Sequence, residues 1–135
     1  MADACDLGVL VERESSLSFA AALERTVALI EAGGMRVFAR IDHAAAAREF
    51  GLSMPPAVVL IYGHPVGGTP IMVAAPNAAL DLPLHVLVRE DGRGLATIAF
   101  RPITDVLLAA GVPAALANKL VPAQTLLLRT LGAPP

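Results

Sequence analysis

Short apolar segments with two different periods follow one another along the chain and predict a domain of mixed strands and helices. Between residues 35 and 41, small or aliphatic side chains alternate with arginine and phenylalanine, and a period of two is typical of a strand. Between residues 19 and 30, apolar side chains recur at helical spacing. Residues 57–62 form a continuous apolar run rich in β-branched side chains, which predicts a central strand buried on both faces.

Residues that cap helices mark the ends of several segments. Ser16 or Ser18 can cap the first helix, which Gly33-Gly34 then ends. Asp42 begins a short alanine-rich helix in the same way. Thr69-Pro70 has the sequence of a third helix start, with Thr as the cap and Pro in the first turn.

Three further strands are predicted over residues 7–12, 84–89 and 95–101. Asp91-Gly92 and Gly94 supply a hairpin turn between the last two strands. A helical region follows and is broken near Gly111 and Pro122. The order is β-α-β-α-β-α-β-β-α-α, an α+β fold with about five strands. We expect a single domain over residues 1–135, frayed at residues 1–6 and 132–135.

The composition adds an expectation about assembly. The 135 residues are 56% hydrophobic and only 16% charged, so a domain of this size has few charged side chains with which to cover its apolar surface. We therefore expect part of the apolar surplus to be buried in a homodimer. The alternative is a surface that is merely rich in alanine.

Charge and targeting features narrow the function classes. The net charge is −2 and no run of Lys or Arg occurs, which argues against nucleic acid or an anionic membrane surface as a partner. No apolar run reaches the length of a spanning helix, and the start MADACD does not resemble a signal peptide. A lone cysteine, Cys5, cannot form an internal disulfide, so a cytoplasmic location is the expectation.

Polar residues at the ends of apolar segments are the candidate site residues. Asp42 and His43 could act as an acid–base pair, although Asp42 is also a good helix cap. His64 follows the segment that ends in Tyr62-Gly63, at a position where ligands often bind. Asp81 lies at a predicted helix C-terminus, where a carboxylate is disfavoured unless it is paired or used.

Two weaker patterns are present in the same part of the chain. The glycine-rich Gly67–Pro70 stretch could bind an anion at a helix N-terminus, but it lacks the lysine and spacing of a phosphate-binding loop. The three histidines, His43, His64 and His85, lack the spacing of metal-ligand motifs. We predict no metal site, and the sequence names no cofactor.

Several blocks together resemble the uncharacterised family called domain of unknown function 302. These blocks are IDHAAAA, PPAVVLIYGHP, GTPIM and APNAALDLPLHVLV, followed by DGRG before a strand. The resemblance covers essentially the whole chain. It implies a small α+β homodimer of the TATA-binding-protein-like class, with a mainly antiparallel sheet, a β-α-β(4)-α core with inserted short helices, and helices packed on one face. This fold class implies nothing about DNA, because function depends on sites rather than folds.

The resemblance also identifies positions that recur in the family. They are Asp42, His43, Gly63, Pro65, Thr69, Pro70, Asp81, Leu82 and Pro83. The family usually has Asn at the position of His64 and Lys or Arg at the position of His85. These two histidines are therefore features of this chain rather than of the family.

Three functional hypotheses follow. The first is a small-ligand-binding homodimer whose pocket is formed by His43, Tyr62, Gly63, His64 and Asp81. The second is an enzyme of hydrolase or isomerase type, with His43 as base oriented by Asp42 or Asp81. The third is a purely structural or interaction role. A crossover between residues 42 and 56 would bring His43 beside His64, whereas an antiparallel sheet would place them at opposite ends.

Overall fold

The computed structural model describes residues 9–131 and contains the predicted elements in nearly the predicted order. The strands are β1 (Val11–Ser18), β2 (Arg36–Asp42), β3 (Ala57–Gly63), β4 (Leu84–Glu90) and β5 (Leu95–Phe100). The helices are α1 (Phe19–Ala32), α2 (His43–Glu49), α3 (Pro65–Ala74), α4 (Ile103–Ala109), α5 (Ala114–Ala117) and α6 (Val121–Leu131). Two short 3₁₀ segments, η2 (Pro76–Leu80) and η3 (Asn118–Leu120), join them.

All five strands form one sheet in the order β1-β5-β4-β3-β2, and every neighbouring pair is antiparallel. The predicted α+β fold with a five-stranded antiparallel sheet is therefore confirmed. The connection through α2 returns the chain antiparallel to β2, so it is not a crossover. The start of β2 consequently lies beside the end of β3, and the two ends of this sheet carry different candidate residues.

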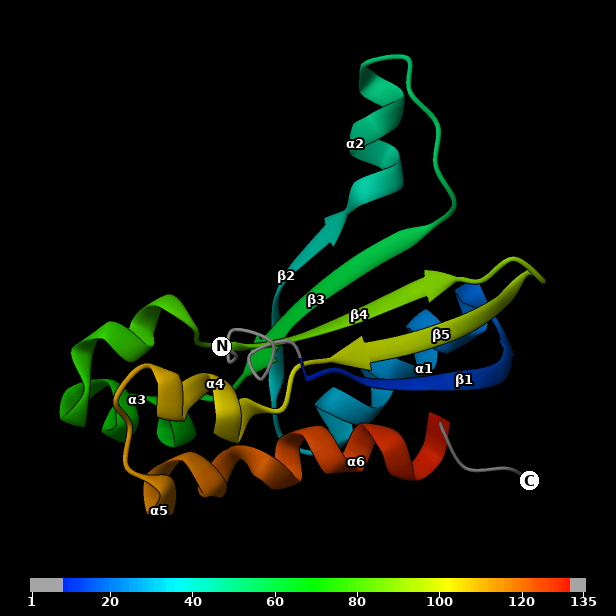
Figure 1. Cartoon of the computed structure of the whole chain (residues 1–135). Helices are drawn as coiled ribbons and strands as arrows, with labels where there is room; N and C mark the ends of the chain where they lie inside the picture. The colour runs from blue at the N-terminus through cyan, green and yellow to red at the C-terminus, as the bar shows by residue number, and fades with distance from the viewer. Residues whose placement is uncertain (1–8, 132–135) are drawn as a thin grey trace.

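The inner face of the sheet packs against α1 and α6 (Figure 1). Alternate residues of the three central strands supply its core, and the side chains of α1 and α6 close it. The buried sheet residues are Val58, Leu60, Tyr62, Leu84, Val86, Val88, Ala96, Ile98 and Phe100. Ile30 of α1 and Leu127 of α6 are fully buried against them. Burying a side chain of this size contributes about 1.5–3 kcal/mol, so this layer is the main source of stability.

Side chains cap the helices at several of the predicted positions. The Ser18 hydroxyl accepts a hydrogen bond from the Ala21 N–H, and the Asp42 carboxylate accepts one from the Ala45 N–H at 2.9 Å. Both caps were predicted from sequence. The cap of α4 comes from a distant residue, because the buried Gln124 accepts from the Ile103 N–H at 2.9 Å.

The third helix begins five residues earlier than the sequence predicted. Thr69 and Pro70 lie inside α3, whose N-cap is His64 and whose first residue is Pro65. By sequence, either Pro65 or Pro70 could begin a helix, because the N–H groups of a first turn have no intrahelical partner and proline lacks an N–H. The prediction chose the second proline because Thr is a familiar cap, whereas the histidine ring performs this role.

The first strand also differs from its prediction. The expected strand over residues 7–12 becomes β1 over Val11–Ser18, and residues 7 and 8 lie outside the described part of the chain. β1 lies at a sheet edge and pairs only with β5, so its burial is weaker than that of a central strand. Apolar and polar residues therefore alternate irregularly in β1, and its sequence only weakly indicates a strand.

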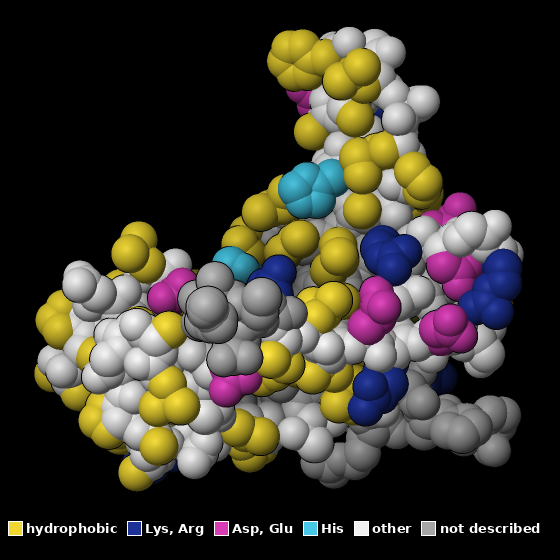
Figure 2. All heavy atoms as spheres, in the orientation of Figure 1, with side chains coloured by type: hydrophobic (Ala, Val, Ile, Leu, Met, Phe, Trp, Pro, Cys, Tyr) yellow, Lys and Arg dark blue, Asp and Glu magenta, His cyan; other side chains and the backbone are white. Residues whose placement is uncertain are grey.

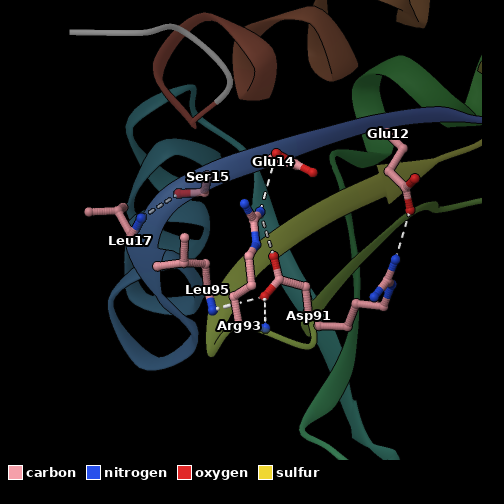
Figure 3. A network of polar contacts seen from close by, with 8 residues as sticks. Glu12, Glu14, Ser15, Leu17, Asp91, Arg93 and Leu95 are labelled. Atoms are coloured by element: carbon pink, nitrogen blue, oxygen red, sulfur yellow. Dashed lines mark hydrogen bonds and ion pairs between the residues drawn. The ribbon is translucent and has the colours of Figure 1, made fainter.

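The turn between β4 and β5 is held by Asp91 (Figure 3). Its carboxylate accepts hydrogen bonds from the backbone N–H groups of Arg93 and Leu95 and from the Arg93 guanidinium. These bonds, that from the Arg93 backbone above all, hold the pKa of Asp91 below its ordinary value. Arg93 also reaches Glu14 of β1 at 3.3 Å, which ties the turn to the edge strand. Of the two predicted turn glycines, only Gly94 has a positive φ, +82°.

Tyr62 joins the sheet to α6 and provides a direct test of this core. Its side chain is 0% exposed, and its hydroxyl donates to the Ala123 carbonyl at 3.0 Å. Burial raises the pKa of the phenol above its ordinary value of 10.0, because the charged form loses its hydration.

We expect the folded protein to keep Tyr62 protonated at a pH where an exposed tyrosine ionises. The folded pKa lies above the unfolded one, so this group's contribution to stability is complete below pH 10 and is lost as the pH rises above it. Because the chain has one Tyr and no Trp, tyrosinate absorbance during an alkaline titration reports on this residue alone. Tyr62→Phe should lower the free energy of unfolding by about 1 kcal/mol at neutral pH and remove this alkaline decline. Ionisation at the ordinary pKa in the folded protein would contradict the packing.

Among residues 9–131, no helix layer covers the outer face of the sheet (Figure 1). Its central row crosses all five strands through Ile41, Val59, Leu87, Ala99 and Glu12. The prediction that β3 is buried on both faces is therefore wrong within one chain, because Val59 and Ile61 remain partly exposed. The continuous apolar run of β3 instead gives this outer face its hydrophobic character.

We call α2 and the loop of residues 50–56 the arm. It rises away from the body of the molecule at one end of β2 and β3 (Figure 1). Three large apolar side chains of its tip are exposed: Phe50 at 83%, Leu52 at 65% and Met54 at 43%. Figure 2, seen from the outer face, shows hydrophobic side chains on the arm and across the sheet, with acidic and basic side chains beside them.

Candidate functional site

The five residues predicted to share one pocket do not come together within one chain. His43 and His64 lie at opposite ends of the sheet, because Asp42 pairs with Val58 whereas Gly63 pairs with Arg36. The five steps along the chain from Val58 to Gly63 span about 17 Å in an antiparallel strand. A pocket must be lined by neighbours, so His43 does not contribute to a site beside His64 within the same chain.

Asp42 and His43 do not form an acid–base pair. The Asp42 carboxylate is engaged in capping α2, and no hydrogen bond or ion pair joins it to His43 in the described structure. His43 is exposed at the base of the arm. The structure thus gives the predicted catalytic histidine no orienting carboxylate from Asp42. Asp81, the other carboxylate proposed to orient His43, follows β3 and α3 in the chain. It lines a hollow to which His43 does not contribute.

Tyr62 is part of the core rather than of a surface site. Its side chain lies fully inside the inner layer, and its hydroxyl is bonded to α6. A ligand could reach it only by displacing that layer.

Asp81 lines a hollow on the outer side of the molecule. It shares this hollow with His85 of β4 and with Arg101, which follows β5. Arg89, on the same strand as His85, is paired with Glu12 at 3.0 Å. Asp81 and His64 are close in sequence, yet they lie on different hollows.

Gly63 and His64 do share a cavity, of about 370 Å³, between the start of β2, α3, the segment before β4, and the start of α6. Fourteen residues line it, and their side chains are almost all apolar. They are Met35, Phe38, Gly63, His64, Pro65, Gly67, Gly68, Thr69, Met72, Leu82, Pro83, Leu84, Leu120 and Ala123. We call this space the His64 cavity. Its volume lies in the range of small-molecule sites, about 300–1,000 Å³.

Local structure explains why the cavity stays open. Gly67 and Gly68 lie on the first turn of α3, so this turn has no side chains there to fill the space. A Cβ added at Gly68 would lie 3.7 Å from the Met72 methyl carbon, which is an ordinary contact distance. On the opposite wall, the Arg36 guanidinium lies 5.0 Å from the centre of the Phe38 ring, which fixes that ring by a cation–π contact.

His64 has a defined role at the cavity. Its Nδ1 accepts a hydrogen bond from the Val66 N–H at 3.0 Å, and this bond caps α3. In a neutral imidazole one nitrogen accepts and the other carries the proton. The ring therefore presents Nε2–H, a donor, to its surroundings.

The glycine-rich stretch is not an anion site. The N–H groups of Gly67 and Gly68 both donate to the His64 carbonyl, at 3.0 and 3.2 Å, and the Val66 N–H is used by the ring. Anion binding at a helix N-terminus requires free N–H groups, and these three are already engaged.

Two further properties concern metals and membranes. Across residues 9–131, no three His, Cys, Asp or Glu side chains are grouped as metal ligands would be. In the same range, none of the helices has the length and apolar character needed to cross a bilayer.

Sequence reasoning missed most of the cavity lining. Several lining residues resemble ordinary core residues in the sequence, namely Met35, Phe38, Met72 and Leu120. Nothing in their local pattern distinguishes the wall of a cavity from a packed layer. The paired glycines after Pro65 were the one available sign, and they were interpreted as a loop.

The fold and the cavity define a class: a small α+β protein with a five-stranded antiparallel sheet, helices on one face and an apolar cavity beside the first turn of α3. The chain belongs to the family described as domain of unknown function DUF302, whose model matches residues 11–130. The sequence resemblance to that family is thereby confirmed.

Relatives and a solved structure extend this result. Over 94 residues, 70% of this chain, the sequence is 45% identical to a protein named fluoride-specific ion channel FluC 1 from Brucella suis biovar 1 and to one of the same name from Brucella abortus biovar 1. The match covers 37% and 34% of those proteins, so the chain spans about a third of their length. The crystal structure of an uncharacterized conserved DUF302 protein from Bacillus stearothermophilus has the same fold, with a TM-score of 0.81 at 17% identity. That comparison covers 89% of this chain and 95% of the other.

Proposed function

We propose that this protein is a homodimer that binds a small, largely apolar molecule in the His64 cavity. The observation that carries the proposal is the cavity itself, about 370 Å³ with an apolar lining and very few polar side chains. Apolar walls with a small number of placed polar groups are typical of small-molecule sites.

The outer face and the arm support the homodimer. An antiparallel sheet that faces water usually alternates apolar and polar residues, but the central row here is apolar over four of its five positions. A second copy of the chain has the same apolar row and the same arm with an exposed apolar tip. A two-fold interface pairs the same surfaces of both copies, so each copy can bury the apolar surface of the other. The charged side chains of this face also favour a second copy of the chain as the partner, because Arg89 and Glu12 are of opposite sign and already paired.

Native mass spectrometry of protein purified from its own host tests both parts of the proposal. The expected spectrum shows a dimer and, on gentle activation, loss of a small neutral mass from each chain. A ligand-free monomer at micromolar concentration would count against the ligand and the dimer alike.

We propose, as a second candidate, that the domain works beside a membrane ion channel. The observation that favours it is the 45% identity to part of proteins named fluoride-specific ion channels. No described helix of this chain could cross a membrane, so we do not assign conduction to it. In the relatives the matched segment and the rest of the protein share one chain, and covalent linkage raises the effective concentration of two modules.

Growth of the host in fluoride distinguishes this second candidate. Deleting the gene should lower fluoride tolerance, and the intact gene supplied in trans should restore it, with chloride at equal concentration as the control. Equal tolerance with and without the gene would end the channel hypothesis and would leave the ligand-binding proposal in place.

A further inference from the structure

We infer that the His64 cavity selects an uncharged, mainly apolar molecule that carries one hydrogen-bond acceptor, and that the His64 Nε2–H is the donor that recognises it. This inference rests on the proposed ligand-binding function and specifies the ligand's chemistry.

The tautomer of His64 is set by the fold. The Val66 N–H approaches Nδ1 at 3.0 Å, so that nitrogen must be the acceptor. The neutral ring then has its proton on Nε2, which can only donate. A ligand that meets this atom gains a hydrogen bond if it offers a carbonyl or ether oxygen, and gains none if it offers a second donor.

The other groups around the cavity do not compete for this role. The backbone N–H groups of Gly67 and Gly68 are already bonded to the His64 carbonyl. Apart from His64, the Thr69 hydroxyl is the one side-chain oxygen or nitrogen among the lining residues. Recognition of a polar atom therefore depends mainly on the histidine.

The lining also excludes charge. None of the lining residues is Lys, Arg, Asp or Glu, and burying an ionised group without a partner is strongly unfavourable. Met35 and Met72 lie on the walls with the Phe38 ring, and thioethers pack well against aromatic surfaces. The combination suits a flat, neutral molecule with a single acceptor at one end.

Three probes of similar size separate the effect of a hydrogen-bond acceptor on affinity from the effect of charge. Acetophenone has a carbonyl acceptor, ethylbenzene has none, and benzoate is ionised. We expect calorimetry or protein-observed NMR to show acetophenone binding roughly two- to tenfold more tightly than ethylbenzene, the worth of one net hydrogen bond. Benzoate should bind most weakly of the three.

His64→Asn tests the role of the ring. Asparagine is a strong helix cap, so it keeps a side-chain acceptor for the Val66 N–H while its shorter side chain withdraws the donor. We expect the preference for acetophenone over ethylbenzene to fall to about one, with ethylbenzene affinity and thermal stability unchanged. His85→Asn makes the same chemical change at a histidine that does not line this cavity, so it is the matched control and should retain the wild-type preference.

The possible outcomes distinguish the inferred selectivity for an acceptor from the proposed binding of a ligand in the His64 cavity. If both aromatic probes bind the cavity with equal affinity in the wild type, ligand binding stands and the acceptor selectivity is wrong. If benzoate binds most tightly, the site is an anion site and the inference fails. If none of the probes binds at millimolar concentration, both the inference and the proposed function fail.

Discussion

The Gly68→Leu variant is expected to lose acetophenone binding by tenfold or more while unfolding at the same or a higher temperature. A Cβ at Gly68 meets the Met72 methyl carbon at 3.7 Å and a Leu82 methyl carbon at 3.9 Å, and both of those residues line the His64 cavity. The remaining atoms of the leucine therefore occupy ligand space. Gly68 lies in α3, where replacing glycine by a good helix former gains about 0.5–1 kcal/mol.

Gly68→Ala is the matched control for this experiment. It offers the same gain in helix propensity but adds one methyl group, so binding should stay within about threefold of wild type, since a buried methylene is worth about 0.8 kcal/mol. Calorimetric titration and thermal unfolding measure the two effects separately. Unchanged affinity in Gly68→Leu would show that the probe binds elsewhere and would remove the structural basis of the proposed function.

If the proposed homodimer forms, the Phe50→Glu variant is expected to stay monomeric at concentrations where the wild-type protein dimerises. Phe50 is 83% exposed at the tip of the arm, so its replacement should leave the fold of one chain intact. Apolar anchors at an interface typically contribute about 2–4 kcal/mol. A symmetric dimer contains the residue twice, so the dissociation constant should rise by roughly a thousandfold or more, at 1.4 kcal/mol for each factor of ten.

Val73→Glu provides the control for the arm. Val73 is a comparably exposed apolar residue, at 77%, but it lies on α3 and away from the arm. Sedimentation velocity should show it to be dimeric like the wild type. A wild-type monomer, or a Phe50→Glu dimer of unchanged affinity, would mean that the arm and outer face serve another partner.

The sequence anticipated the elements better than the site. Two of the three predicted caps were confirmed, Asp42 alone and Ser18 as one of two serine alternatives, because an N-cap depends on a few neighbouring residues and the chain displays them directly. The start of α3 was mistaken, because two prolines five residues apart each satisfy the same local rule. The choice between them came from a histidine ring that reaches the Val66 N–H, and helix statistics do not favour that cap.

The grouping of the candidate residues failed for a different reason. Asp42, His43 and His64 are all close to strand ends, but whether two such ends meet depends on the direction in which the strands pair. An antiparallel β2–β3 pair places them at opposite ends of the sheet. The cavity residues that do meet come from four separate segments, between residues 35 and 123.

The sequence by itself determined the family, the order of the elements and five strands of an α+β fold, since periodicity and capping act over a few residues. Only the tertiary structure decided which face of the sheet stays open, which histidine borders a cavity and which tautomer that histidine adopts. Those properties arise from contacts between distant segments, and local pattern carries no record of such contacts. His64 shows the difference: in the sequence it is a turn residue after a strand, and in the fold it caps α3 through its ring and borders an apolar cavity.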